Sequence, residues 1–168
     1  VDYIKPTPDF PPSLTFDFDE TFETVGAEVK NVQENVGLCE VNGFNRFEIT
    51  GADRHEFLDR MFCGTVTRRP GRVGLGYLLN HHGMLKGEAT IANLPASDRG
   101  PARIWYGSAA AAELHDMDWL QAHLHADEDV QIRSLTNAQT ILVLAGPRAR
   151  AVLSACARGG AGASGCKP

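Results

Sequence analysis

A glycine-rich stretch over residues 72–91 constrains the fold more than any other part of the chain. It reads as two extended runs around a tight turn, with glycines at positions 74, 76, 83 and 87. Glycine inside a strand often marks a place where a ligand or another backbone comes close. The turn falls at either His81-His82 or His82-Gly83, and the sequence leaves both open. We therefore predict a β-hairpin that lies beside a candidate ligand site.

Alternation along this hairpin assigns its side chains to two faces. On the second run one face carries Lys86, Glu88 and Thr90, and the other carries Leu85, Ala89 and Ile91, which we expect to face the core. On the first run, either Tyr77 or Leu75 lies near Glu88, depending on the register. Gly76 and Gly87 are expected to leave room for a flat ligand.

Glu88 is a lone carboxylate among apolar neighbours. A carboxylate in such a place is a candidate for acid–base or ligand-orienting work. The alternative is a solvated surface hairpin in which Lys86 and Glu88 form a weak ion pair.

The rest of the chain alternates between helical and extended patterns. Helical stripes begin near Asp17 or Asp19, at the Thr50–Asp53 capping pattern, at Ser108 and at Pro147. The stripes are Phe22, Val25, Val29, Val32 and Val36, then Phe57, Leu58, Met61 and Phe62, then Ala110, Leu114, Met117 and Leu124 with Leu120 alongside. Extended runs cover 38–50, 102–106, 130–135 and 141–145. This order predicts an α+β fold in which helices pack on an antiparallel sheet.

Composition narrows the class of protein. With 43% hydrophobic residues the 168-residue chain can bury a core, and its net charge of −5 argues against a nucleic-acid partner. No apolar run approaches the roughly 18 residues that a membrane span requires. Four scattered cysteines without a CxxC pair indicate reduced thiols in a cytosol-like compartment.

Both ends differ in composition from the middle. We expect residues 1–20 to form a proline-rich linker, 21–154 a partial domain, and 155–168 a flexible or aberrant tail. A fragment, a reading frame that goes astray near the end, and a natural flexible tail all remain open.

Three other clusters have weaker chemical signals. His115, His123 and His125 lie near Asp127–Asp129 but match no familiar metal-ligand spacing, so we expect no metal. Arg68, Arg69 and Arg72 form a basic cluster that either pairs with an anionic ligand or is solvated. Residues 160–165 satisfy GxGxxG, but they neither follow a strand nor open a helix, so the dinucleotide interpretation fails.

An ordered series of short motifs points to a family. It comprises Gly37–Gly51, Phe57–Arg60, Pro70–Val73, the Leu79-Asn80-x-x-Gly83 turn, Trp119-Leu120 and Leu144–Arg150. From about Glu28 to Leu153 the chain resembles the folate-binding domain of the glycine-cleavage T-protein (aminomethyltransferase) family. It looks most like the version fused behind a flavin domain in dimethylglycine and sarcosine dehydrogenases.

The resemblance implies tetrahydrofolate as the ligand and the N-terminal part of the aminomethyltransferase folate-binding fold. In the family, a carboxylate shortly after an Asn-x-x-Gly turn lies near the folate nitrogens that accept the one-carbon unit. Glu88 falls at that place, where the family usually has aspartate. The resemblance assigns a role to Glu88 alone. From the hairpin pattern and the adjacent arginine cluster we expect Tyr77, Gly76, Gly87 and Arg72 to bind the folate. Any FAD would bind in an upstream domain that this chain lacks.

The expected function is one-carbon transfer to tetrahydrofolate, forming the 5,10-methylene form, within an enzyme similar to dimethylglycine or sarcosine dehydrogenase. The implied partners are folate, a one-carbon donor derived from a small methylated amine, and the flavin domain. We expect a cytoplasmic location, or the mitochondrial matrix in a eukaryote. The alternatives are a non-catalytic folate-binding regulatory or iron–sulfur maintenance protein, and an inactive fragment. Iron–sulfur maintenance relatives typically carry Lys-Gly-Cys-Tyr, which the tail Gly165–Pro168 lacks.

Overall fold

The computed structural model describes residues 18, 21–98 and 100–156. The chain divides into two compact units, one spanning Glu40–Ile141 and the other combining the residues before and after it. Apart from Phe18, the predicted linker 1–20 lies outside the described residues, as do the helix starts at Asp17 and Asp19 and the GxGxxG segment. The predicted tail begins too early, because Ala155 and Cys156 belong to the last helix.

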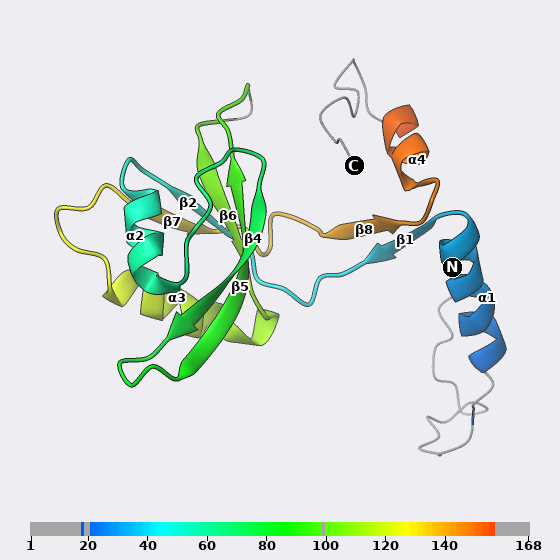
Figure 1. Cartoon of the computed structure of the whole chain (residues 1–168), viewed down its shortest axis with the longest axis horizontal. Helices are drawn as coiled ribbons and strands as arrows, with labels where there is room; N and C mark the ends of the chain where they lie inside the picture. The colour runs from blue at the N-terminus through cyan, green and yellow to red at the C-terminus, as the bar shows by residue number, and fades with distance from the viewer. Residues whose placement is uncertain (1–17, 19–20, 99, 157–168) are drawn as a thin grey trace. The chain divides into compact units, whose positions relative to one another are not determined.

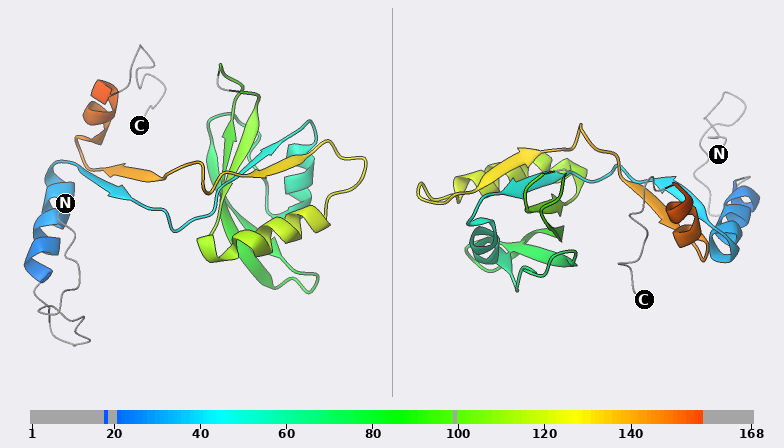
Figure 2. Two further views of the ribbon diagram at one scale, coloured as in Figure 1. Left: turned by 180° about the vertical axis from the view of Figure 1, so that it is seen from behind. Right: turned by 90° about the horizontal axis from the view of Figure 1, so that it is seen from above.

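The unit Glu40–Ile141 is built on a six-stranded sheet with the order β3-β4-β5-β6-β2-β7 (Figure 1). Its strands are β2 (Phe47–Thr50), β3 (Phe62–Cys63), β4 (Val73–Leu79), β5 (Leu85–Leu94), β6 (Arg103–Gly107) and β7 (Gln131–Ser134). All five neighbouring pairs are antiparallel. β7 lies along β2 at the edge of the sheet (Figure 2). The predicted α+β class with an antiparallel sheet is confirmed.

Two helices of this unit pack on the sheet. They are α2 (Arg54–Met61) and α3 (Glu113–Ala122), the latter preceded by a single 3₁₀ turn, η1 (Ala110–Ala112). Both contribute to one apolar core, whose fully buried members include Phe57 and Leu58 of α2, Leu120 of α3, and Phe47, Ile49, Leu78 and Ile104 of the sheet. The predicted apolar face of α2 is thus confirmed.

The approach to α2 depends on a glycine. Gly51 has a φ of +108°, and a Cβ there would lie only 1.9 Å from the backbone oxygen of Asp129. Only glycine combines this conformation with so close a backbone contact. The predicted capping box at Thr50–Asp53 is wrong. Asp53 is the N-cap residue but makes no side-chain capping bond, and its carboxylate instead accepts the Asp129 N–H at 2.9 Å.

The start predicted for α3 is also wrong. Ser108 lies four residues before η1 ends, is buried, and bonds to other buried polar groups instead of capping a helix. Leu114, which the stripe placed on the apolar face, is 79% exposed, whereas Leu120 is fully buried. The predicted stripe begins at Ala110, which lies in the 3₁₀ turn. Because a 3₁₀ turn has three residues per turn, the apolar face of the following α-helix is rotated relative to that stripe.

The second unit contains α1 (Phe22–Glu34), α4 (Ala149–Cys156) and a two-stranded sheet of β1 (Gly37–Glu40) and β8 (Leu142–Ala145). The last residue of β1, Glu40, is counted with the first unit. Gly146, with a φ of +115°, lies against the end of α1, where a Cβ would be 2.6 Å from the carbonyl oxygens of Val32 and Asn35. The Arg148 N–H donates to the Asn35 oxygen at 2.9 Å. Neither helix contains a buried residue.

No helix among the described residues is long and apolar enough to cross a membrane. Three of the cysteines, Cys39, Cys63 and Cys156, are exposed.

Candidate functional site on the outer face of the hairpin

The hairpin turn is organised by Asn80. Its carbonyl accepts the Gly83 N–H at 2.9 Å, and its side-chain oxygen accepts the N–H groups of His82 and Met84, both at 3.0 Å. The central turn residues are therefore His81 and His82, the first of the two predicted alternatives. An asparagine that bonds to the backbone two residues on is typical of such turns.

The register of β3, β4 and β5 places three polar side chains in a row. Cys63 pairs with Tyr77, and Tyr77 pairs with Glu88. Directly opposite residues of antiparallel strands point to the same face and lie about 5 Å apart. Tyr77, and not Leu75, is thus the neighbour of Glu88, and Cys63 continues the row.

We call this side of the hairpin the outer face. Besides the row it carries Val73 and Leu75, which are 63% and 57% exposed, while Tyr77 is 40% exposed. Such a group of exposed apolar side chains around a carboxylate is typical of a surface that contacts a ligand or another part of a protein. Among the described residues, the Glu88 carboxylate has no hydrogen-bond or ion-pair partner, so it is available to a ligand.

The expected space beside Glu88 at the glycines is not found on this face. Gly76 pairs with Ala89 and is buried on the core side, where a Cβ would lie 2.5 Å from the Phe62 ring. Gly87 pairs with Leu78, and its nearest side-chain atom, an oxygen of Asp116, is 3.8 Å from where a Cβ would be. The prediction that both glycines make room for a flat ligand next to Glu88 is therefore wrong. Gly76 permits close packing against Phe62 on the opposite side, whereas a Cβ at Gly87 would meet only an ordinary contact there.

A register shift between Leu78 and Leu79 explains two further errors. Leu85 was expected in the core and is 64% exposed. Lys86 was expected on the face of Glu88, but its ammonium lies 2.7 Å from Nε2 of His115 and 4.2 Å from the centre of the Trp119 ring. The pairs Leu78–Gly87 and Leu79–Leu85 leave Lys86 as an extra residue in β5. Such a bulge shifts the alternation of the side chains between the two faces, so the period-two pattern fails next to the turn. Ala89 and Ile91 are buried as predicted.

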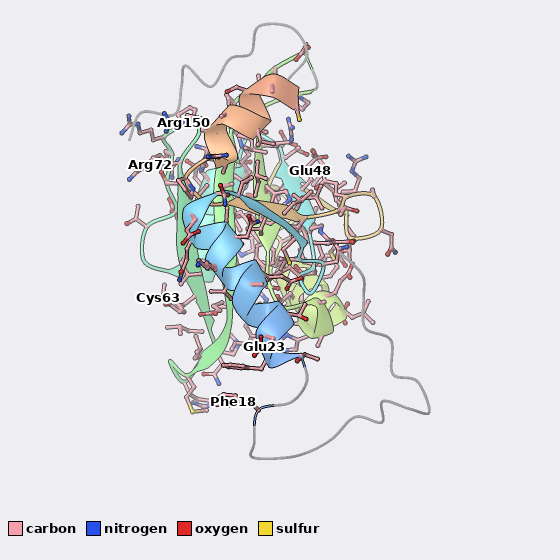
Figure 3. The ribbon with its side chains drawn as sticks, turned by 90° about the vertical axis from the view of Figure 1, so that its right-hand side faces the viewer. Phe18, Glu23, Glu48, Cys63, Arg72 and Arg150 are labelled. Carbon is pink, nitrogen blue, oxygen red and sulfur yellow. The ribbon has the colours of Figure 1, made fainter. Side chains whose placement is uncertain are left out.

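The arginine cluster divides into two roles. Arg68 forms ion pairs with Glu56 at 2.8 Å and Asp59 at 2.7 Å, which keep the pKa of Glu56 low and raise that of Arg68. Arg72 is exposed, and its guanidinium has no partner among the described residues. It precedes β4 and lies five residues from Tyr77, or about 16 Å along the strand. Figure 3 labels Arg72 and Cys63 at separate places along the same side of the view.

A buried polar network lies on the other side of the sheet. The Asp116 carboxylate is 2% exposed and accepts the Tyr106 hydroxyl at 2.7 Å and the Ser108 hydroxyl at 2.5 Å. Asn45 joins the network through Ser108, to which its amide group donates at 2.6 Å. Burial, followed by the bond to Asp116, raises the pKa of Tyr106 well above its usual range.

His115 links this network to the surface. Its Nδ1 lies 3.1 Å from the Asp116 carboxylate and its Nε2 faces the ammonium of Lys86. The Asp116 network therefore connects β6, α3 and the β5 end of the hairpin. Its hydrogen bonds satisfy the buried carboxylate, as buried polar groups require. Sequence reasoning missed Asp116 because a lone aspartate within a helix has no motif. The one indication in the sequence is its position four residues before Leu120, which places both side chains on the same face of a helix.

The candidate metal ligands do not converge. Over the described part of the chain, no group of three or more histidine, cysteine or acidic side chains is arranged to hold a metal ion. Glu128 instead pairs with Arg60 at 2.5 Å, and the His125 N–H together with Arg60 lowers its pKa. His123 contacts Trp119, with ring centroids 4.2 Å apart.

Known proteins resemble this chain over most of its length. It is 31% identical to dimethylglycine dehydrogenase from Rattus norvegicus over 90% of the chain, which spans 17% of that protein. It is also 31% identical to the pyruvate dehydrogenase phosphatase regulatory subunit of Mus musculus, over 84% of the chain and 16% of that protein. The chain thus spans about a sixth of these relatives.

A solved structure supports the fold. The glycine cleavage system aminomethyltransferase T from Bartonella henselae matches with a TM-score of 0.65 and 22% identity, over 77% of this chain and 34% of the other. The family model described as the GCVT N-terminal domain matches residues 3–163. The match covers nearly the whole sequence, and the chain therefore belongs to the GCVT N-terminal domain family.

Proposed function

We propose that this domain binds tetrahydrofolate on the outer face of the hairpin and transfers a one-carbon unit to it. The enzyme would be of the dimethylglycine or sarcosine dehydrogenase type, and the product 5,10-methylenetetrahydrofolate. The observation that carries the proposal is the Glu88 carboxylate, which is exposed, without a partner among the described residues, and directly opposite Tyr77. Family membership supports the same reaction class.

Glu88 would act on the amine that receives the carbon. An amine nitrogen that attacks an iminium or formaldehyde-level carbon loses a proton as the new C–N bond forms. A carboxylate within hydrogen-bond reach can orient that nitrogen beforehand and accept the proton. An exposed carboxylate with no competing partner suits this role, because no internal bond has to break when the ligand arrives.

The apolar part of the outer face would hold the ligand in place. Tyr77 and Leu75 offer an exposed ring and an aliphatic side chain on the face of Glu88. Folate is elongated and has a glutamate carboxylate at one end. Arg72, about 16 Å from Tyr77 along β4, is unpaired among the described residues and would receive that carboxylate. Holding both reactants together supplies much of the rate in such reactions.

Other cofactor residues are assigned less directly. Gly76 would contribute by allowing close packing of Phe62 beneath the outer face, and Gly87 by its place in β5 next to Glu88. We assign FAD to a separate domain, where it would oxidise the methylated amine, because the described residues offer no glycine-rich turn between a strand and a helix for it.

The test is a comparison of Glu88→Gln and Glu88→Ala with the unaltered complete gene product. We expect methylenetetrahydrofolate formation to fall by about 100-fold or more, the usual contribution of a general base, while free formaldehyde accumulates. Glu88→Asp restores part of the yield, because it keeps the carboxylate. Glu23→Ala, an exposed glutamate in α1, is the matched control. An unchanged yield in Glu88→Gln would refute the role of Glu88.

A second candidate function is regulation without transfer chemistry. The relative named as a regulatory subunit supports it, since its name describes no reaction of its own. In that case tetrahydrofolate still binds, and Tyr77→Ala weakens binding, but turnover of any methylated glycine stays at background. Location follows the parent enzyme: we propose the cytoplasm, or the mitochondrial matrix in a eukaryote, as in the relatives named mitochondrial.

A further inference from the structure

A buried arginine lies immediately before β2, away from the hairpin. Arg46 is 2% exposed. Its Nη1 donates to the carbonyl of Thr136 at 2.8 Å and its Nη2 to the side-chain oxygen of Asn42 at 2.7 Å. A guanidinium has five N–H donors. Its Nε is buried and has no hydrogen-bond partner, so part of the donor fork is unused.

The charge of Arg46 is also not balanced. Among the described residues no carboxylate forms an ion pair with it, in contrast to Arg60, Arg68, Arg103 and Arg133, which all pair with acidic side chains. A buried charge without a counter-ion is costly, so proteins normally pair it. An arginine held in place by two neutral acceptors, with its charge unpaired, is therefore suited to receive an anion.

A hollow of about 370 Å³ adjoins this arginine. Its lining includes Asn42, Thr136, Asn137, Gln139 and Thr140, all within the unit Glu40–Ile141. The Gln139 oxygen accepts the Trp105 indole N–H at 3.4 Å. Among the residues that the structure describes, the side-chain N–H₂ of Gln139 has no acceptor. Polar donors of this kind fix the orientation of a small ligand in a pocket of this size.

We propose that this hollow binds a small carboxylate, with Arg46 as the counter-ion and the Asn137 and Gln139 amides as additional donors. A guanidinium presents a planar fork that matches the two oxygens of a carboxylate. No acidic residue is among the described residues that line the hollow. Glu40, two residues before Asn42 in the chain, is exposed and accepts a bond from the Asn42 amide. The site is independent of the outer face, since β6 lies between β5 and β2 in the sheet.

The first experiment follows the Arg46 Nε–H signal by NMR while acetate or N,N-dimethylglycine is added to the full chain. Arg46→Lys identifies the signal by its loss. We expect the signal to shift in a saturable manner with both carboxylates, and the thermal midpoint to rise with ligand concentration, because the ligand binds only the folded state. No shift, or tighter binding of inorganic phosphate than of acetate, would overturn the proposal.

Two exposed alanines supply a test that does not disturb the core. Ala138 lines the hollow, and Ala138→Glu places a carboxylate beside Arg46. We expect this variant to weaken acetate binding about tenfold or more, since it replaces a charged hydrogen bond. Ala126→Glu, in the exposed segment after α3, adds the same charge outside the hollow and leaves binding unchanged. Equal effects of the two variants would show that overall charge, and not the hollow, governs the response.

Discussion

The two units of this chain differ in how far each buries its own apolar residues. In the unit Glu40–Ile141 the sheet, α2 and α3 enclose a continuous core. In the other unit no described residue is buried, and Val25 and Val29 of the α1 stripe are each about half exposed. Both show regular apolar patterns in the sequence. A pattern therefore indicates which side chains can be buried, while burial depends on whether enough other elements are present to cover them.

The energetic consequence is an uneven distribution of stability. Folding requires apolar burial to offset the loss of conformational entropy. The unit with the core meets that requirement from its own residues, so it should govern global unfolding. The elements α1, β1, β8 and α4 should open at lower free energy, in the way that regions with few buried contacts do.

The largest effect is expected from the core. Phe47→Ala removes a fully buried ring that stacks on Tyr106, with centroids 5.3 Å apart. We expect a loss of about 3–5 kcal/mol in the free energy of unfolding, measured by urea denaturation. A loss below that of a surface substitution would contradict the assignment of the core to this unit.

Disruption of the Asp116 network should cause the second-largest loss of stability. Asp116→Ala leaves the Tyr106 and Ser108 hydroxyls without their acceptor in a buried place. We expect a loss of about 2–3 kcal/mol, because each unpaired buried group is costly. The same denaturation experiment measures it. Asp118→Ala, on an exposed position of the same helix, is the control and should change stability little.

A pH-dependent effect should come from His55 and reach at most about 1.4 kcal/mol per pH unit for one proton. Burial, followed by the charges of Arg54 and Arg68, lowers the pKa of His55. The unfolded chain therefore takes up a proton near its ordinary value of 6.5 while the folded chain does not. Stability is retained above that pH and falls as the pH drops below it.

Urea midpoints at neutral and mildly acidic pH test this. The difference between the two midpoints should shrink in His55→Asn. If His55→Asn shows the same difference in urea midpoint between the two pH values as the unaltered protein, a group other than His55 takes up the proton on unfolding.

The smallest effect is expected in the second unit. Val29→Ala shortens a side chain of α1 that is 49% exposed. We expect a change within about 0.5 kcal/mol, since alanine also favours the helix. Urea denaturation measures the free energy of global unfolding, and limited proteolysis of the native protein measures local opening of α1. A loss comparable to that of Phe47→Ala would erase the contrast between the two units.

Much of the fold follows from the sequence, and the errors have local causes. Period-two alternation located β2 and the middle of the hairpin, where Ala89 and Ile91 are buried. It failed at Leu85 and Lys86, where the register shifts, because a bulge has no composition of its own. Helical spacing failed at Leu114 for a similar reason, since the 3₁₀ turn precedes α3.

The candidate site was predictable only in part. The position of Glu88 after the Asn80 turn was visible in the sequence, and the choice between Tyr77 and Leu75 required the register. Cys63 and Arg46 could not be found, since strand pairing and an unpaired buried charge are properties of the folded chain. The role assigned to the glycines was wrong because a missing side chain in a strand leaves space on only one face, and the sequence does not say which.

The position of β2 between β6 and the edge strand β7 has a consequence during synthesis. Its residues pair with β6 and with β7, so that Phe47 lies opposite Tyr106 on one side and Ser134 on the other. At a translation rate of about 5–20 residues per second, β7 is synthesised several seconds after β2. Until then its apolar side chains and unpaired backbone groups remain open to other nascent chains. The sheet order thus leaves β2 paired on one edge only until β7, the last strand of this sheet, has left the ribosome.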